Sequence, residues 1–188
     1  MTDQGLQAAG LHMIYHAVVK ITLFFGAGAV LAKSGKEYVS QLSGLAGKMP
    51  VTFASYTLAS LALMGIPPLP GFWSKWAIGS AAANVGTTLA FWGIAALMLS
   101  ALLTALYQMG VVVQGYFPTD DQQETPSTPR MSKKQRRSPR MQLRATRAIY
   151  SNQLESKNMN LTLLILSAAI LLLGIFDGYV EQWVHLLF

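Results

Sequence analysis

The chain contains no cysteine and few charged residues. Without cysteine there is no disulfide scaffold, iron–sulfur cluster, thiolate metal site or cysteine nucleophile. Charged residues make up 12% of the 188 residues, whereas a soluble globular domain usually has about a quarter. Hydrophobic residues make up 52%. Such a composition indicates an integral membrane protein.

Positive charge is scarce in most of the chain and concentrated in one stretch. Of the 14 Lys and Arg residues, nine lie between positions 118 and 158. This stretch begins acidic, becomes strongly basic over 130–140, and has few apolar residues, which predicts a disordered linker. Basic segments beside a membrane span are attracted to anionic lipid. A cytoplasmic anchor on anionic lipid is therefore favoured over a nucleic-acid-binding arm, and no nucleic-acid partner is expected.

The remaining sequence is dominated by apolar runs that predict membrane crossings. About 20 apolar residues span the hydrocarbon core, and the predicted crossings are 8–32, 50–84, 87–116 and 161–176. The predicted fold is all-α and membrane-spanning, with four crossings. It divides into a transmembrane region over 8–117, the basic linker over 118–158, and a C-terminal crossing with its tail over 159–188.

The second crossing cannot be one continuous helix. Its middle carries the helix-breaking residues Pro67, Pro68, Pro70 and Gly71, and each proline removes a backbone donor and clashes with the preceding turn. We expect half-helices over 51–65 and 72–83 with an unwound stretch between them. Irregular backbone at membrane depth survives only beside protein or a water-filled cavity. The break therefore indicates a functional site.

The distribution of lysine predicts the orientation in the membrane. Lys33, Lys36 and Lys48 lie in the loop after the first crossing, and two crossings separate this loop from the basic linker. Both segments therefore lie on the same side, which the positive-inside rule identifies as the cytoplasm. We expect a multi-pass protein of the cell (inner) membrane with both termini outside.

Three ionisable residues share one face of the first crossing. His12, His16 and Lys20 are spaced four residues apart, so they drift little around the helix and rise by about 6 Å per step. Gaps of this size suit a chain in which water molecules bridge the side chains. Lys20 is near the middle of its crossing, where a charge costs at least about 2.5 kcal/mol and is usually retained for function.

Lys75 opens the half-helix that follows the proline break. Desolvation disfavours the charged form of a buried lysine, and histidine exchanges protons near neutral pH. A lysine can instead pair with an acid of a neighbouring subunit, and a lone histidine is usually a packed core residue. Three ionisable residues on one face, with a lysine at a helix break, favour a proton relay of His12, His16, Lys20 and Lys75.

With these residues the sequence resembles the antiporter-like proton-translocating subunits of complex I (NADH:quinone oxidoreductase) and of Mrp-type cation/proton antiporters. The resemblance covers residues 10–117. It is carried by the segments 12–28, 44–50 and 65–75, whose order and separation match the family. Its members are bundles of roughly fourteen helices built from inverted repeats, each with a broken helix. This chain resembles the last four helices, the eleventh to the fourteenth.

The resemblance implies roles for individual residues. Lys20 matches the central relay lysine of the family, His12 and His16 match the histidines before it, and Lys75 matches the ionisable residue on the second broken helix. Trp76 stands where many complex I members carry an acid, so Ser74-Lys75-Trp76 is closer to the Mrp and hydrogenase-associated branch. The first repeat is absent from this sequence, and the basic linker has no counterpart in the family.

Proton translocation is therefore the predicted function, as the C-terminal half of a subunit of a respiratory, hydrogenase or Mrp-type complex. Exchange of Na⁺ is left open, as is the choice among the three complexes. The expected partners are other membrane subunits and an N-terminal half. No cofactor or metal is predicted, and redox chemistry would belong to partner subunits. The alternatives are a non-conducting structural anchor and the remnant of a split gene.

Overall fold

The computed structural model describes residues 2–117 and 139–187, with the side chains of 139–156, 185 and 187 left undescribed. The regular secondary structure in these residues consists of helices joined by short turns and loops. The elements in chain order are α1 (Asp3–Ser34), η1 (Val39–Leu42), η2 (Leu45–Gly47), α2 (Pro50–Met64), α3 (Pro70–Val85), α4 (Thr88–Tyr116), α5 (Pro139–Ile175) and α6 (Asp177–Leu187).

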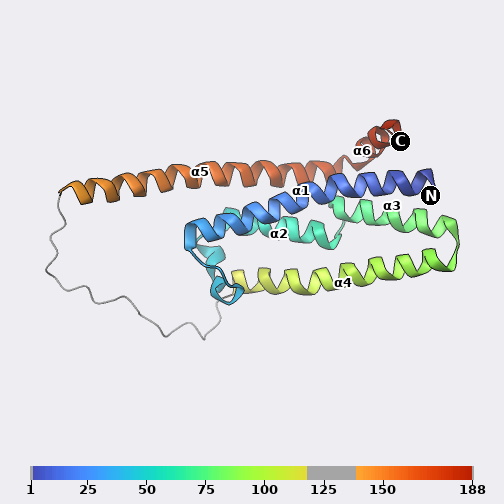
Figure 1. Ribbon diagram of the computed structural model, residues 1–188, viewed down its shortest axis with the longest axis horizontal. Helices are drawn as coiled ribbons and strands as arrows, with labels where there is room; N and C mark the ends of the chain where they lie inside the picture. The colour runs from blue at the N-terminus through green and yellow to red at the C-terminus, as the bar shows by residue number, and fades with distance from the viewer. Residues whose placement is uncertain (1, 118–138, 188) are drawn as a thin grey trace.

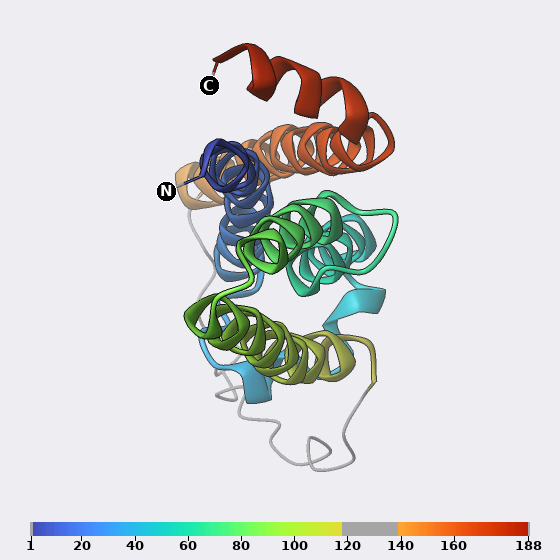
Figure 2. The ribbon, with the colours of Figure 1, turned by 90° about the vertical axis from the view of Figure 1, so that its right-hand side faces the viewer.

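The long helices run side by side, and α2 and α3 lie end to end along α1 (Figure 1). α4 returns along the pair, while α5 packs on the other side of α1, as the end-on view in Figure 2 also shows. α2 and α3 have 15 and 16 residues against 32 in α1. The broken pair thus covers nearly the length of the unbroken helix, because each residue adds the same rise.

Three described helices are long and apolar enough to cross a membrane: α1, α4 and the Lys157–Ile175 part of α5. α2 is a shorter apolar helix, and with α3 it forms a fourth, discontinuous crossing. The predicted all-α membrane fold with four crossings is confirmed. The predicted half-helices correspond to α2 and α3, and each begins with a proline at its first position, where the missing N–H has no helical partner anyway.

Close backbone contacts hold the break between α2 and α3. Gly65 ends α2 in the left-handed conformation, with φ of 94°, which side chains other than hydrogen rarely allow. A Cβ on Gly71 would lie 1.8 Å from the carbonyl oxygen of Ala62. On the α5 side, a Cβ on Gly174 would lie 2.5 Å from the carbonyl oxygen of Pro68. Neighbouring backbone therefore encloses the irregular segment, as a membrane requires.

One part of the sequence prediction needs correction. The disordered linker predicted over 118–158 does not extend across 139–158, because α5 begins at Pro139; residues 118–138 lie outside the described chain. Proline is favoured at the first position of a helix, and the Arg, Gln, Leu and Ala that follow are good helix formers. The density of charge indicated disorder, although the same residues favour a helix.

The packing at Gly71 gives a direct test of the break. Gly71→Ala should lower the free energy of unfolding by about 3 kcal/mol or more, because its Cβ collides with backbone that cannot move aside. Gly79→Ala is the matched control, because it lies in the same helix and a Cβ there meets nothing within 4 Å. Thermal unfolding in detergent, followed by circular dichroism, measures both; equal midpoints would contradict this packing.

Candidate functional site

A cavity of about 120 Å³ lies where the break meets α1 and α4. This central cavity is lined by the following residues: His12, Tyr15, His16, Val19, Ala62, Leu63, Gly71, Ser74, Lys75, Leu97, Ser100 and Thr104. Three of the four predicted relay residues therefore share one space. The lining of the cavity combines polar and ionisable side chains with apolar ones, and its volume has room for several water molecules.

The two histidines line the cavity from α1. Their ring centroids are 5.5 Å apart, with the ring planes tilted by 35°. His12 Nδ1 and Ser74 Oγ form a hydrogen bond of 3.0 Å, in which the donor depends on the histidine tautomer. Ser74 is fully buried, so this bond joins α1 to α3 inside the protein. The shared helix face predicted for His12 and His16 is present.

Lys75 makes two hydrogen bonds to the end of α2. Its Nζ donates to the carbonyl oxygens of Leu63 and Met64, at 2.8 and 2.9 Å. In an uninterrupted helix these carbonyls would accept from the N–H groups of residues 67 and 68. Both positions are proline and have no N–H. The Lys75 ammonium replaces the two backbone donors that Pro67 and Pro68 remove.

Lys20 is the one predicted relay residue outside the central cavity. It is half-buried and forms no hydrogen bond with another described residue. Lys20 lies one helical turn beyond His16. The positive charges of Lys20 and Lys75 both act on the His16 ring. The central cavity ends along α1 at Val19, and a second cavity of about 440 Å³ begins at Phe24. Lys20 falls between these two stretches of α1.

Several residues of the site were not predicted. Ser74 lies within the 65–75 segment of the resemblance, but nothing in the sequence marks it as a site residue, although it forms a hydrogen bond with His12. Ser100 and Thr104 of α4 also line the central cavity. Their spacing of four residues within an apolar helix is a signal that could have identified them, since both fall on one face. The hydrogen bond from Tyr15 to Asp177, across 162 positions, leaves no local trace in the sequence.

No group of three or more His, Cys, Asp or Glu side chains in the described part of the chain could hold a metal ion. The fold and the central cavity define a membrane protein with a broken helix and an ionisable centre at the break. Residues 1–107 match the family described as NADH:quinone oxidoreductase/Mrp antiporter, TM. The match covers more than half of the chain, and the chain belongs to this family.

Individual relatives agree with this assignment. The chain is 40% identical over 112 residues to NADH-quinone oxidoreductase subunit N of Desulforudis audaxviator, a match covering 60% of this chain and 22% of the relative. It is 40% identical over 102 residues to NADH-quinone oxidoreductase subunit L of Rickettsia conorii, a match that covers 54% of this chain and 15% of the relative. The chain thus spans about a fifth or less of the length of these curated relatives.

A solved structure shares the fold. The structure of the Mrp complex from Dietzia sp. DQ12-45-1b matches with a TM-score of 0.70 and 22% identity, over 95% of this chain and 36% of that one. Because the structural match extends over nearly the whole chain, it also includes regions beyond the family match at residues 1–107.

The two lysines should differ in their effect on stability. Lys75→Met leaves the part-buried carbonyl oxygens of Leu63 and Met64 without their lysine donor, and a buried unsatisfied group costs about 1–3 kcal/mol. Lys75→Arg, which retains N–H donors, should recover most of this loss. Lys20→Met should be neutral or stabilising, because a charge near mid-membrane is costly. Thermal unfolding in detergent compares the three; equal losses for the two Met variants would exclude the capping role of Lys75.

Proposed function

We propose that this chain moves protons across the membrane as the C-terminal half of an antiporter-like subunit of a respiratory, hydrogenase or Mrp-type complex. The observation that carries the proposal is the central cavity, in which His12, His16 and Lys75 gather beside a break in a membrane helix. Ionisable residues inside a membrane are expensive and commonly mark proton pathways.

The hydrogen bonds of Lys75 explain how it can exchange a proton without losing its structural role. An ammonium group has three N–H donors, and two of them bind Leu63 and Met64. The neutral amine retains two N–H bonds and gains a lone pair. The third proton can therefore leave for the cavity and return while both carbonyls keep a donor.

The surroundings of Lys75 act on its charge in opposing directions. Burial disfavours the ammonium form, and His16 and His12 in the same cavity add positive charge whenever they are protonated. The negative end of the α2 dipole, at Leu63 and Met64, favours the ammonium form. Balanced forces of this kind suit a group that must take up and release protons.

A route through the described residues would run from Lys20 to His16, then through the central cavity to His12 and Lys75. Consecutive members on α1 are about 6 Å apart along the helix, so bridging water would complete the connection. Carboxylates are absent from the described lining of the central cavity. Since hard cations take oxygen ligands, above all carboxylates, the proposal is for protons and leaves Na⁺ exchange open.

A non-conducting structural anchor is the second candidate. The capping bonds of Lys75 favour it, because a purely structural lysine would make the same contacts. Trp73 supports it too, since its indole Nε1 donates to the carbonyl oxygen of Gly174 at 3.1 Å and ties α3 to α5. A variant that keeps the cap but cannot release a proton separates the two functions.

Lys75→Arg is such a variant, because the guanidinium retains donors and charge but is not deprotonated in proteins. In vesicles containing the assembled complex, Lys75→Arg should lower proton translocation at least about tenfold. Lys20→Met should lower it comparably, because it removes the neighbouring relay group. The amount of assembled complex is the control. Undiminished translocation in both variants would favour the anchor.

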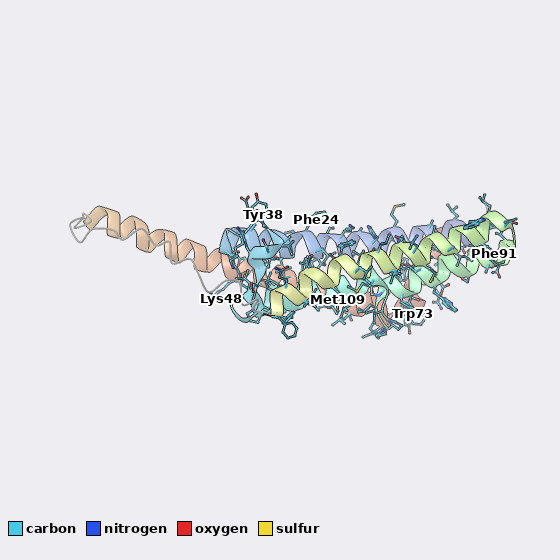
Figure 3. All side chains as sticks on the ribbon, turned by 90° about the horizontal axis from the view of Figure 1, so that it is seen from below. Phe24, Tyr38, Lys48, Trp73, Phe91 and Met109 are labelled. Carbon is cyan, nitrogen blue, oxygen red and sulfur yellow. The ribbon has the colours of Figure 1, made fainter. Side chains whose placement is uncertain are left out.

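We also propose that the end carrying Lys33, Lys36 and Lys48 faces the cytoplasm and that both termini lie outside. Tyr38 and Lys48 lie at one end of the bundle and Phe91 at the opposite end (Figure 3). At the proposed cytoplasmic end, Lys33 Nζ donates to Asn160 Oδ1 at 2.8 Å. Basic residues next to spans are typical of the cytoplasmic side. Anionic lipid remains the predicted partner of the basic segment.

The absence of cysteine gives a clean test of this orientation. A single cysteine at exposed Lys48 or exposed Asn84 would be the only thiol in the chain. A membrane-impermeant thiol reagent added to intact cells should label Asn84→Cys and spare Lys48→Cys until the cells are opened. The reverse pattern would invert the proposed orientation.

A further inference from the structure

A buried tyrosine joins the first helix of the chain to the last. Tyr15 of α1 is 1% exposed, and its hydroxyl donates to Asp177 Oδ1 at 2.5 Å. Asp177 is the first residue of α6, which begins just after α5 ends at Ile175. α6 lies at the same end of the bundle as the N-terminus (Figure 1). The bond therefore lies towards the proposed outer side.

The two partners of this bond line different cavities. Tyr15 lines the central cavity together with His12, His16 and Lys75. Asp177 lines a separate cavity of about 450 Å³, which also contains Glu181, Gln4, Gln7 and Asn84. This outer cavity covers the Gln4–Leu11 stretch of α1, and the central cavity covers the next stretch, His12–Val19. Tyr15 and Asp177 thus stand where the two spaces approach each other.

We infer that Asp177 is the outer proton acceptor of the chain and receives protons from the central cavity through the Tyr15 hydroxyl. The inference rests on the proposed function. In the transfer, the O–H bond of Tyr15 breaks and an O–H bond forms on the Asp177 carboxylate. At the same time the tyrosine oxygen takes a proton from a protonated imidazole or a hydronium ion in the central cavity. Tyr15 is unchanged, and Asp177 then releases its proton to water in the outer cavity.

The charges around Asp177 suit this role. Burial raises the pKa of its carboxyl, the hydrogen bond from Tyr15 acts to lower it, and the negative charge of Glu181 raises it further, for a net upward shift. An upward shift brings a carboxyl closer to the pH at which it can both accept and release protons. Glu181 lines the same outer cavity, and its negative charge attracts protons to that cavity.

A simpler role for the bond is to tether α6 to α1. Asp177→Asn distinguishes the two, because the amide oxygen can still accept from Tyr15 but the side chain no longer titrates. Asp177→Glu restores a carboxyl with one more methylene. Tyr15→Phe removes only the hydroxyl and keeps the buried ring. Asp3→Asn is the matched control. Asp3 is an exposed acid at the N-terminal end of α1, the end of the bundle at which α6 lies (Figure 1), and it lines neither cavity.

The experiment measures proton translocation by the assembled complex in vesicles, per unit of complex. Asp177→Asn and Tyr15→Phe should each lose at least about tenfold, while Asp177→Glu retains most of the rate and Asp3→Asn all of it. Azide or formate, as small proton carriers added on the outer side, should restore translocation in Asp177→Asn. Neither weak acid should restore translocation in Lys75→Arg, because Lys75 lies in the central cavity and not in the outer cavity that the acids enter.

Each contrary result has a distinct meaning. If Lys75→Arg stops translocation but Asp177→Asn translocates at the wild-type rate, the inference fails while the proposed function stands. A loss in Asp177→Asn that neither weak acid nor Asp177→Glu relieves would show a tether, which also overturns the inference. Full translocation in Lys75→Arg together with Lys20→Met would overturn the proposed function and the inference with it.

Discussion

The two hydrogen bonds from Lys75 Nζ to the carbonyl oxygens of Leu63 and Met64 satisfy the demand that a membrane makes most strongly on a folded chain. Backbone groups at membrane depth have little water to bind, and each unsatisfied one costs several kcal/mol. Pro67 and Pro68 create that demand by removing the donors that these carbonyls would otherwise meet. The lysine and the prolines therefore act together, because the lysine supplies the two donors that the prolines remove.

The rest of the centre is arranged around this device. Gly71 lets the start of α3 approach the carbonyl of Ala62, and Gly174 lets α5 cover the break closely. Trp73 and Ser74 directly precede the lysine and form hydrogen bonds with Gly174 on α5 and His12 on α1, respectively. The same contacts that satisfy the backbone thus carry the ammonium to a cavity containing two histidines. Only two of the three N–H donors of Lys75 are bound to the carbonyl oxygens at the end of α2, which is the geometry that the proposed proton exchange requires.

The sequence was informative wherever the relevant signal is local. Proline spacing located the break, hydrophobic length located the crossings, and helical periodicity placed His12 and His16 on one face. Lys20 shares that face but lies beyond the central cavity, because a shared face does not determine how far along the helix a neighbour packs. The bond between Tyr15 and Asp177 depends on the packing of α6 against α1, which no local pattern records. Residues 139–158 lie in α5 and not in a disordered linker, because the helix propensity of these residues outweighs the density of charge that indicates disorder.

The central claim is that Lys75 closes the broken helix and offers its third N–H to a water-filled space shared with His12 and His16. The most direct measurement is a structure of the assembled complex at a resolution that reveals ordered water. The account predicts water within hydrogen-bonding distance of Lys75 Nζ, in a chain that reaches the ring of His12 or His16. A dry cavity filled by apolar side chains, with all three Lys75 donors bound to backbone, would contradict it.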